Sequence, residues 1–276
     1  MKEMNGMKAT KKADMHMHST VSDGSCRIET LIDMAKAKGL DAMVITDHDT
    51  LSHRNQIPAY PGITVACGAE LSACDPKTGM RAHILGYRIE KPEVVEQAAL
   101  PILEARHANS LRQIEILRKE GYPIDLSEIR KADGKYIYKQ HIMDYLFHLG
   151  AVGELFGEFY YKTFKNGGIC DFDIQYLDAR TAVDVIRQAG GLPVLAHSGQ
   201  QQNFYLVPEL VEQGLAGLEL NHHANSEKDK EIIRELADRY GLFLTGGSDF
   251  HGIYEPKICS VGSYLAEESG WDAVFG

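Results

Sequence analysis

The chain has 276 residues, a formal net charge of −10 and a sequence pI near 5.6. Its 44% apolar and 25% charged residues are typical of a globular protein and exclude a disordered chain. The acidic balance excludes a basic surface of the kind that binds a long nucleic acid duplex. Short phosphorylated molecules remain possible ligands, because bound divalent cations can supply local positive charge.

The cysteines are odd in number and contain no C-x-x-C pair, which predicts reduced thiols: Cys26, Cys67, Cys74, Cys170 and Cys259. The start, Met1 to Lys12, is polar and lysine-rich, and no apolar run is long enough for a membrane span. We therefore expect a cytoplasmic protein with no membrane partner.

Two histidines open the first ordered segment. His16 and His18 are separated by one residue in a segment with strand-like alternation, so we expect them on one face of a strand, where one divalent ion could bind both. Asp23 follows in a Ser-Asp-Gly turn that could place a carboxylate over the end of that strand. An isolated pair of this kind is more often an inert buried pair, so the rest of the chain must decide.

Alternating helices and strands follow. The sequence predicts a helix over Ile28 to Lys38 and a strand over Leu40 to Asp47, which ends at His48. A third strand, Ile63 to Ser72, carries Glu70 near its carboxyl end. α/β barrels keep their chemistry at the carboxyl ends of the strands.

A fourth strand is predicted over Arg81 to Tyr87 and contains His83. Residues 91–173 then change to helical patterns, such as Val94 to Glu120, which predicts a helical insertion. Within it, Lys139 and His141 precede a helix that ends near Gly150, where the amino end of a helix could bind an anion. Solvated surface positions are an equally weighted alternative for both.

The strand and helix pattern resumes after the insertion. Polar residues again follow the predicted strands: His197 after Leu192 to Ala196, His222 after Gly217 to Leu220, and Asp249 with His251 after Leu242 to Gly246. Helices are predicted over Ala179 to Gln188, Pro208 to Gln213 and Glu227 to Tyr240, and no ligand cluster is expected in Ile253 to Gly276.

The residues that gather at strand ends are imidazoles and carboxylates: His16, His18, Asp23, His48, Glu70, His83, His197, Asp249 and His251. Nitrogen and carboxylate ligands without sulfur favour zinc, manganese or iron. The set is too large for one ion and suits two or three divalent ions. Such ions generate hydroxide from water at neutral pH, so hydrolysis is the expected chemistry.

As an ordered set, these motifs resemble the PHP (polymerase and histidinol phosphatase) family: His16-Met17-His18, Ser22-Asp23-Gly24, Thr46-Asp47-His48-Asp49-Thr50, Glu70, His83, Ala196-His197 and Gly247-Ser248-Asp249-Phe250-His251. The resemblance implies an α/β fold, a distorted (β/α)7 barrel over residues 13–90 and 174–276, and an inserted helical cap domain over residues 91–173 after the fourth strand. It also implies a trinuclear metal centre.

The resemblance further implies which residues bind each ion. His16, His18, Glu70 and Asp249 would hold the first, Glu70 would bridge to a second held by His83 and His197, and Asp23, His48 and His251 would hold the third. Lys139 and His141 would bind a substrate phosphate, although relatives carry an Arg-Pro-His-Ile segment where this chain reads Lys139-Gln140-His141-Ile142. An ammonium binds phosphate less directionally than a guanidinium.

His222 would bind a substrate phosphate or act as a general acid, with Asp249 as the second catalytic residue. An exposed loop histidine is the alternative for His222. The implied activity is metal-dependent hydrolysis of small phosphorylated substrates, with nucleoside 5'- or 3',5'-bisphosphates first and 5'-3' cleavage of short oligoribonucleotides or histidinol phosphate next. A non-catalytic accessory module and an amidohydrolase remain alternatives.

Overall fold

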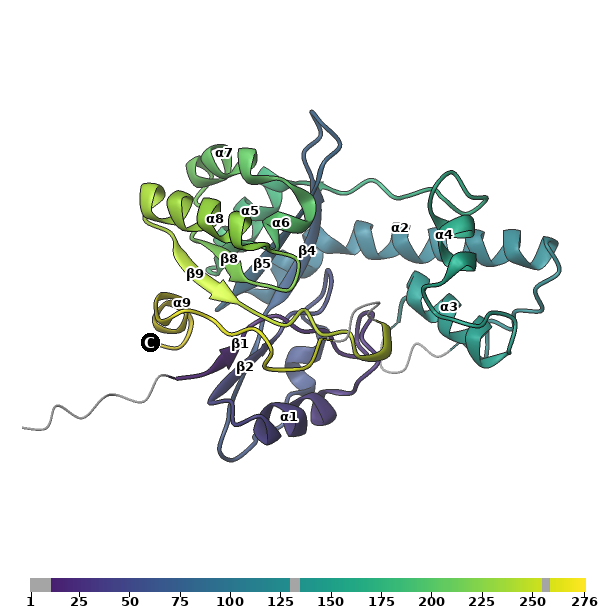
Figure 1. Ribbon diagram of the computed structural model, residues 1–276, viewed down its shortest axis with the longest axis horizontal. Coiled ribbons are helices and arrows are strands. Elements are labelled where there is room, and N and C mark those ends of the chain that lie inside the picture. The colour runs from purple at the N-terminus through teal and green to yellow at the C-terminus, as the bar shows by residue number, and fades with distance from the viewer. Residues whose placement is uncertain (1–10, 130–134, 255–258) are drawn as a thin grey trace, which may run out of the picture.

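The computed structural model describes residues 11–129, 135–254 and 259–276, and nearly all of the Met1 to Lys12 segment lies outside these ranges. The described chain has an α/β fold in which the strands form two sheets and the helices pack around them (Figure 1). Among the described residues, no helix combines the length and the apolar character that crossing a membrane requires.

The first sheet has three parallel strands in the order β1-β2-β3, formed by Ala13–Asp14, Ala42–Ile45 and Thr64–Cys67. Helix α1, Ile28–Ala37, buries Ile28, Leu31, Ile32 and Ala35 against this sheet, as its helical spacing predicts. The predicted helix and second strand are therefore confirmed to within two residues.

The second sheet has six strands in the order β6-β4-β5-β7-β8-β9. The strands are Ala69–Cys74 (β4), Arg81–Tyr87 (β5), Leu177–Asp178 (β6), Leu192–Leu195 (β7), Gly217–Asn221 (β8) and Phe243–Gly246 (β9). β5 runs antiparallel to β4 and β7, whereas the other pairs are parallel. The amino end of β5, with His83, therefore lies beside the carboxyl end of β7.

Helices cover the second sheet and complete the core. They are α5 (Ala179–Gln188), α6 (Ser198–Gln201), α7 (Val207–Glu212), α8 (Glu227–Tyr240) and α9 (Glu268–Phe275), with short 3-10 turns η1 (Ser52–Gln56), η2 (Phe204–Leu206) and η3 (Gly252–Tyr254). The predictions for α5, α7 and α8 are confirmed, whereas α9 has no counterpart among the sequence predictions.

The single strand predicted over Ile63 to Ser72 is wrong, because the chain divides it at Gly68 into β3 and β4, which belong to different sheets. A side chain at Gly68 would place its Cβ 2.8 Å from the Gly86 carbonyl oxygen, so only glycine fits this crossing. Glu70 consequently lies at the beginning of β4 and not near the carboxyl end of a strand.

The predicted strand through His16 and His18 is also shorter than expected. Its parallel ladder covers only Ala13–Asp14, and beyond it Met17 makes an isolated bridge to Phe250. The two histidines flank this bridge, with ring centroids 5.3 Å apart. Their proximity therefore depends on one backbone bridge and not on a continuous strand.

Residues 91–129 and 135–173 contain helices and no strand. They are α2 (Pro92–Lys119), α3 (Lys139–His148) and α4 (Glu158–Phe164). Figure 1 shows α2 extending away from the sheets, with α3 and α4 beside its far half. These helices share a hydrophobic cluster that includes Ile114, Leu117, Ile142, Leu146 and Phe164.

Candidate metal centre

Glu70 lies at the centre of a buried cluster of histidines and is itself only 1% exposed. Its Oε1 is 2.7 Å from Nδ1 of His83 and 3.0 Å from Nε2 of His197. Its Oε2 is close to three further imidazoles: His16 at 3.2 Å, His18 at 3.1 Å and His48 at 3.3 Å. One carboxylate thus connects histidines from both sheets.

Asp249 forms a second carboxylate of the cluster. Its Oδ1 is 3.1 Å from Nε2 of His16 and 3.1 Å from Nε2 of His18. Its backbone has a positive φ of 51°, and its N–H donates to the carbonyl of His16 at 2.7 Å. Such a conformation is uncommon for a residue with a side chain and persists where the surroundings impose it.

Asp23 gathers the remaining predicted ligands. Its Oδ1 is 3.4 Å from Nε2 of His251 and 3.8 Å from Nδ1 of His18, and its Oδ2 is 3.9 Å from Nε2 of His48. His18 therefore faces both Asp23 and the pair Glu70 and Asp249. The fold brings all the predicted imidazoles and carboxylates into one continuous network.

Neighbouring groups fix which nitrogen of two histidines faces the cluster. His16 Nδ1 lies 2.9 Å from Oε1 of Glu219, and His251 Nδ1 lies 2.8 Å from the carbonyl oxygen of Asp249. Both partners accept hydrogen bonds, so each Nδ1 carries a proton and each Nε2 is the nitrogen that could bind a metal ion after losing its own proton. Ligating histidines usually have this arrangement, with the second nitrogen donating to a carboxylate or carbonyl.

Several buried atoms of the cluster have no hydrogen-bond partner among the described residues: His16 Nε2, His18 Nδ1, His48 Nδ1, His197 Nδ1 and Glu70 Oε2. Buried polar atoms are nearly always satisfied, so each exception needs an explanation. Imidazole and carboxylate donors at this separation suit divalent zinc, manganese or iron. Metal ions therefore fit the residues present.

The charges of the cluster also favour a bound cation. Burial disfavours the charged form of His16, but the carboxylates of Asp249, Glu219 and Glu70 outweigh it and raise its pKa well above the ordinary value. Burial lowers the pKa of His48 to about 4, so that this imidazole is neutral at pH 7 and able to bind a metal ion.

Asp47 supports the segment that carries His18 and Asp23. Its Oδ1 accepts the Ser19 N–H at 2.7 Å and the Ser22 hydroxyl at 2.6 Å, and its Oδ2 accepts the Ser19 hydroxyl at 2.6 Å. His53 Nδ1 lies 3.1 Å from the same Oδ2. This buried carboxylate therefore fixes the turn after His18.

Replacing Asp47 with asparagine should lower the free energy of unfolding by about 2–3 kcal/mol. The NH₂ group of the new amide would face groups of Ser19 and Ser22 that donate hydrogen bonds to the carboxylate. Urea unfolding of the metal-free protein measures the change. The matched control is Asp238→Asn, an exposed residue of α8. Equal free energies for the two variants would contradict a supporting role for Asp47.

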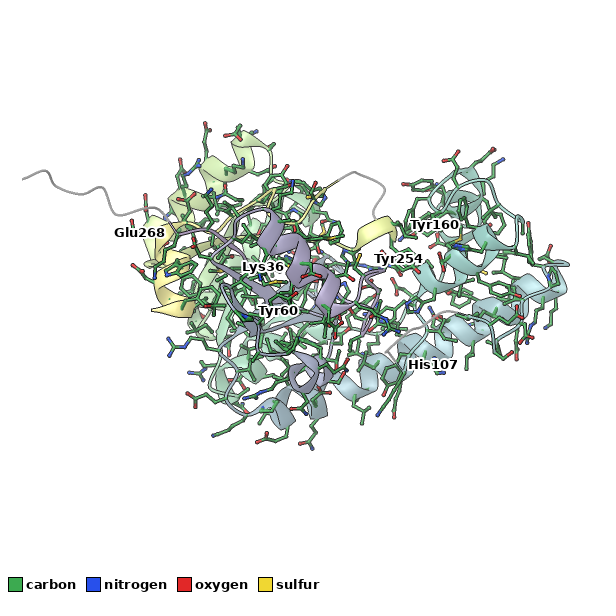
Figure 2. The ribbon with its side chains drawn as sticks, turned by 90° about the horizontal axis from the view of Figure 1, so that it is seen from below. Lys36, Tyr60, His107, Tyr160, Tyr254 and Glu268 are labelled. Carbon is green, nitrogen blue, oxygen red and sulfur yellow. The ribbon has the colours of Figure 1, made fainter. Side chains whose placement is uncertain are left out.

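Lys139 and His141, both predicted to bind substrate, line two different cavities. Lys139 lines a cavity of about 200 Å³ together with Asp23, His48 and His83 of the cluster. His141 instead lines a separate cavity with Tyr254, and its Nδ1 accepts the N–H of Tyr138 at 3.1 Å. Figure 2 shows Tyr254 at the boundary between the sheets and the helices of residues 91–173.

His222 is fully buried beside the cluster, and not exposed in a loop. Its Nδ1 accepts the N–H of Ala224 at 3.1 Å, so the neutral ring carries its proton on Nε2, which lies 3.3 Å from Oδ2 of Asp249. An imidazole in this state can donate a hydrogen bond from Nε2.

Sequence reasoning missed two charged residues of the site. Glu219 is buried inside β8, where its Oε2 accepts the His197 N–H at 2.9 Å in addition to the contact with His16. Arg106 reaches from α2 to Asp49 and Ser72. A charged residue at the centre of the apolar strand Gly-Leu-Glu-Leu was the available signal for Glu219, whereas one arginine of a long polar helix gave none.

Comparisons with known proteins agree with this arrangement. Residues 14–240 match the family described as PHP domain. A phosphoribosyl 1,2-cyclic phosphate 1,2-diphosphodiesterase of Eggerthella lenta is 42% identical over 246 residues, which cover 87% of this chain and 94% of that protein. A 3',5'-nucleoside bisphosphate phosphatase of Chromobacterium violaceum is 30% identical over 258 residues, which cover 86% of each chain.

The fold has a solved counterpart. The crystal structure of a protein from Bifidobacterium adolescentis matches with a TM-score of 0.85 and 24% identity, over 97% of this chain and 96% of that one. The family match spans most of the sequence, and the relatives are named for the hydrolysis of phosphate esters. The chain therefore belongs to the PHP domain family and is a metal-dependent phosphoesterase.

Proposed function

We propose that this phosphoesterase hydrolyses a ribose phosphate that carries a cyclic phosphate diester and a second phosphoryl group. The observation that carries the proposal is the cavity beside the histidine cluster, in which Asp23, His48 and His83 share one space with Arg106 and Lys139. The cavity has a volume of about 200 Å³. The 42% identical relative is named for such a substrate.

We assign the metal ligands as the sequence predicted them. His16, His18, Glu70 and Asp249 would bind one ion, with Glu70 bridging to His83 and His197, and Asp23, His48 and His251 would form a further site. Two of these groups place one atom from every member within 4.8 Å of the others: His16, His18, Glu70 and Asp249, and His18, Asp23, His48 and His251. The geometry supports two or three manganese, zinc or iron ions.

When bound, the ions would supply a water of lowered pKa as the nucleophile and neutralise charge on the phosphate. The chain's own groups would do the rest. His222, whose Nε2 carries the proton because Nδ1 accepts the Ala224 N–H, would donate a hydrogen bond to a phosphate oxygen, and the departing ribose oxygen would take its proton from water as the P–O bond breaks. Lys139, which lines the same cavity, would bind the phosphoryl group that is retained.

We propose that the two sheets together form the distorted (β/α)7 barrel of this family. Two isolated bridges support closure: Met17 with Phe250 joins β1 to β9, and His48 with Glu70 joins β2 to β4. The ring would then be β1, β2, β3/β4, β5, β7, β8 and β9. Residues 91–173, with the shared cluster of α2 to α4, would form the inserted cap domain.

We also propose that the protein works in the cytoplasm. The cysteines form no disulfide among the described residues, and the buried Cys170 is one of them. Free thiols are usual where glutathione and thioredoxin keep proteins reduced, and secreted domains use disulfides instead.

If the role of Lys139 is to bind phosphate, its charged form should lower the free energy of unfolding of the protein. Burial, with the charges of Lys165, Arg81 and Arg106, lowers its pKa from 10.5 to about 8 against the opposing effect of Asp171. The folded protein therefore binds this proton more weakly than the unfolded chain does. The resulting loss in the free energy of unfolding is fully present below pH 8 and disappears as the pH rises from 8 toward 10.5.

The Lys139→Met variant should consequently unfold at a higher temperature at pH 7. A penalty of about 1–2 kcal/mol, reduced for partial exposure, corresponds to an increase in Tm of about 2–6 °C. Circular dichroism at pH 7 and pH 9.5 measures the difference, which should narrow at the higher pH. Lys162→Met, at a side chain that is 73% exposed, is the control. A lower Tm for Lys139→Met at pH 7 would contradict the prediction.

The substrate proposal is tested by following the hydrolysis of four compounds in parallel with added Mn²⁺, by phosphorus NMR, which detects the ring-opened monoester as well as free phosphate. They are phosphoribosyl 1,2-cyclic phosphate, a 3',5'-nucleoside bisphosphate, a short 5'-phosphorylated RNA and histidinol phosphate. We expect the highest kcat/KM with the cyclic phosphate and none after chelation of the metal.

Each other outcome overturns the proposed substrate and names another. Preference for the bisphosphate would favour the nucleotide phosphatase expected from the sequence, and mononucleotides released from RNA without free phosphate would identify an exonuclease. Preference for histidinol phosphate would assign that reaction instead. No turnover in metal-loaded protein would point to an accessory role or to another ester.

A further inference from the structure

The helices of residues 91–173 contact the histidine cluster at one of its groups of candidate ligands. In the first turn of α3, Gln140 Nε2 donates to Oδ2 of Asp23 at 2.8 Å. The hydroxyl of Tyr138, the residue before α3, donates to the His48 carbonyl at 3.3 Å. Both contacted residues belong to one group of four: His18, Asp23, His48 and His251. The start of α3 therefore packs against this group.

A further contact reaches the same segment from α2. Arg106 Nη2 donates at 2.9 Å to Oδ2 of Asp49, the residue that follows His48. Oδ1 of Asp49 accepts the Ser72 N–H at 2.8 Å, which joins this carboxylate to β4 as well. Helices α2 and α3 therefore both hold the segment that carries His48.

His16 and Asp249 are oriented by groups outside these helices. His16 Nδ1 lies 2.9 Å from Oε1 of Glu219, which belongs to β8. The Asp249 N–H donates to the His16 carbonyl at 2.7 Å. Because neither contact involves α2, α3 or α4, the loss of a contact from α3 should affect one metal site and leave the one at His16 and Asp249 in place.

The amide of Gln140 makes a short hydrogen bond to a carboxylate that is otherwise weakly held. The Ser22 hydroxyl lies 3.4 Å from Oδ1 of Asp23, but its single hydrogen is directed at Oδ1 of Asp47, 2.6 Å away. Gln140 thus holds Oδ2 of Asp23, while Oδ1 faces Nε2 of His251 at 3.4 Å. A carboxylate fixed at one oxygen presents the other to a metal ion in a defined orientation.

We propose that Gln140 is a positioning residue that orients Asp23 as a metal ligand, and so makes the affinity of one metal site dependent on the inserted helices. The inference rests on the ligand assignment in the proposed function, which gives that site to Asp23, His48 and His251. The amide is neutral, so it orients the carboxylate without cancelling the negative charge that attracts a cation. Groups that orient ligands in this way change metal affinity by about 10–100-fold.

The test measures Mn²⁺ binding to the full chain by calorimetry in the wild type, Gln140→Met, Asp23→Asn and the double variant. Methionine has a similar length and helix propensity to glutamine but no hydrogen-bond donor. We expect one class of Mn²⁺ ions to bind about tenfold or more weakly in Gln140→Met, with the other ions unchanged. Because Gln140 acts through Asp23, its replacement should have no further effect in Asp23→Asn.

Gln188→Met is the matched control, because the exposed Gln188 of α5 also donates from Nε2 to a carboxylate, that of Asp184. It should bind Mn²⁺ as the wild type does. In the hydrolysis of bis(p-nitrophenyl) phosphate, the Mn²⁺ concentration for half-maximal rate should rise about tenfold in Gln140→Met. Equal weakening of every ion would indicate a structural defect and overturn the proposal. A higher KM at an unchanged Mn²⁺ requirement would assign Gln140 to substrate binding and also overturn it.

The Asp23→Asn variant separates this proposal from the proposed function. Loss of one ion in Asp23→Asn, with wild-type binding in Gln140→Met, would overturn the role of Gln140 and leave the ligand assignment in place. Wild-type Mn²⁺ binding in Asp23→Asn would overturn the assignment of Asp23 as a ligand, and the proposal with it. Neither result depends on which phosphate ester the enzyme hydrolyses.

Discussion

The Glu70→Gln variant should retain its fold and lose phosphate ester hydrolysis by about 10³-fold, the equivalent of about 4 kcal/mol of transition-state stabilisation. Burial opposes ionisation of Glu70, but His48, His83 and His16 outweigh it and hold its pKa well below the ordinary value. The carboxylate is therefore charged at every pH at which the enzyme could work. Glutamine has nearly the same shape, so the substitution removes the charge and leaves the packing in place.

Two measurements on Glu70→Gln separate lost metal from lost shape. Bound metal per chain is determined by elemental analysis after dialysis against a defined Mn²⁺ concentration, and kcat/KM is measured on bis(p-nitrophenyl) phosphate. Glu158→Gln, whose side chain is 78% exposed, is the control and should match the wild type in both. A Glu70→Gln protein with full metal content and wild-type turnover would refute the central position that we give this carboxylate.

Removing the charge of Glu219 should weaken metal binding by about 10–100-fold, although this residue contacts the histidines from behind. The carboxylate accepts from His16 Nδ1 at 2.9 Å and from the His197 N–H at 2.9 Å, which requires two acceptor oxygens. The Glu219→Gln amide supplies one acceptor and one donor. Either His16 loses the bond that keeps its Nε2 facing the cluster, or the buried His197 N–H loses its partner.

The dissociation constant for Mn²⁺, measured by competition with a chelator, is the primary readout for Glu219→Gln, because it does not depend on turnover. Glu235→Gln, on the exposed face of α8, provides the control. Unchanged metal affinity in Glu219→Gln would show that the tautomer of His16 is fixed by other contacts. Reduced affinity with an unchanged free energy of unfolding would confirm a positioning role.

Much of the architecture could be predicted because its signals are local. The apolar spacing in Ile28 to Lys38 and the charged face of Glu227 to Tyr240 each predict a helix that the structure contains within a residue or two. The strand Arg81–Tyr87 was also found with its bounds. Each of these segments buries one face, so apolar residues must recur at the spacing of a helix or a strand, and that spacing can be read from the sequence alone.

Other features depend on contacts between distant segments. Gly68 interrupts a run of strand-forming residues because the carbonyl of Gly86 lies against it, and no local pattern reveals that contact. β5 runs antiparallel to its neighbours, so His83, near the amino end of β5, lies beside the carboxyl end of β7. In a regular barrel all strands are parallel, and such a residue would lie at the opposite end. Lys139 and His141 were both predicted to bind a substrate phosphate, whereas in the structure the two residues line different cavities.

The hydrolytic metal chemistry of the site follows from residue types alone, because imidazoles and carboxylates placed after successive strands are suited to binding metal ions for hydrolysis. The orientation of those groups depends on contacts between distant segments, which only the folded chain shows. Packing between segments far apart in the chain places Glu219 within hydrogen-bond distance of His16. It also places Arg106 and Lys165 in the wall of one cavity. Ligand types are a property of residues, whereas the orientation of a lone pair and the shape of a cavity are properties of the fold.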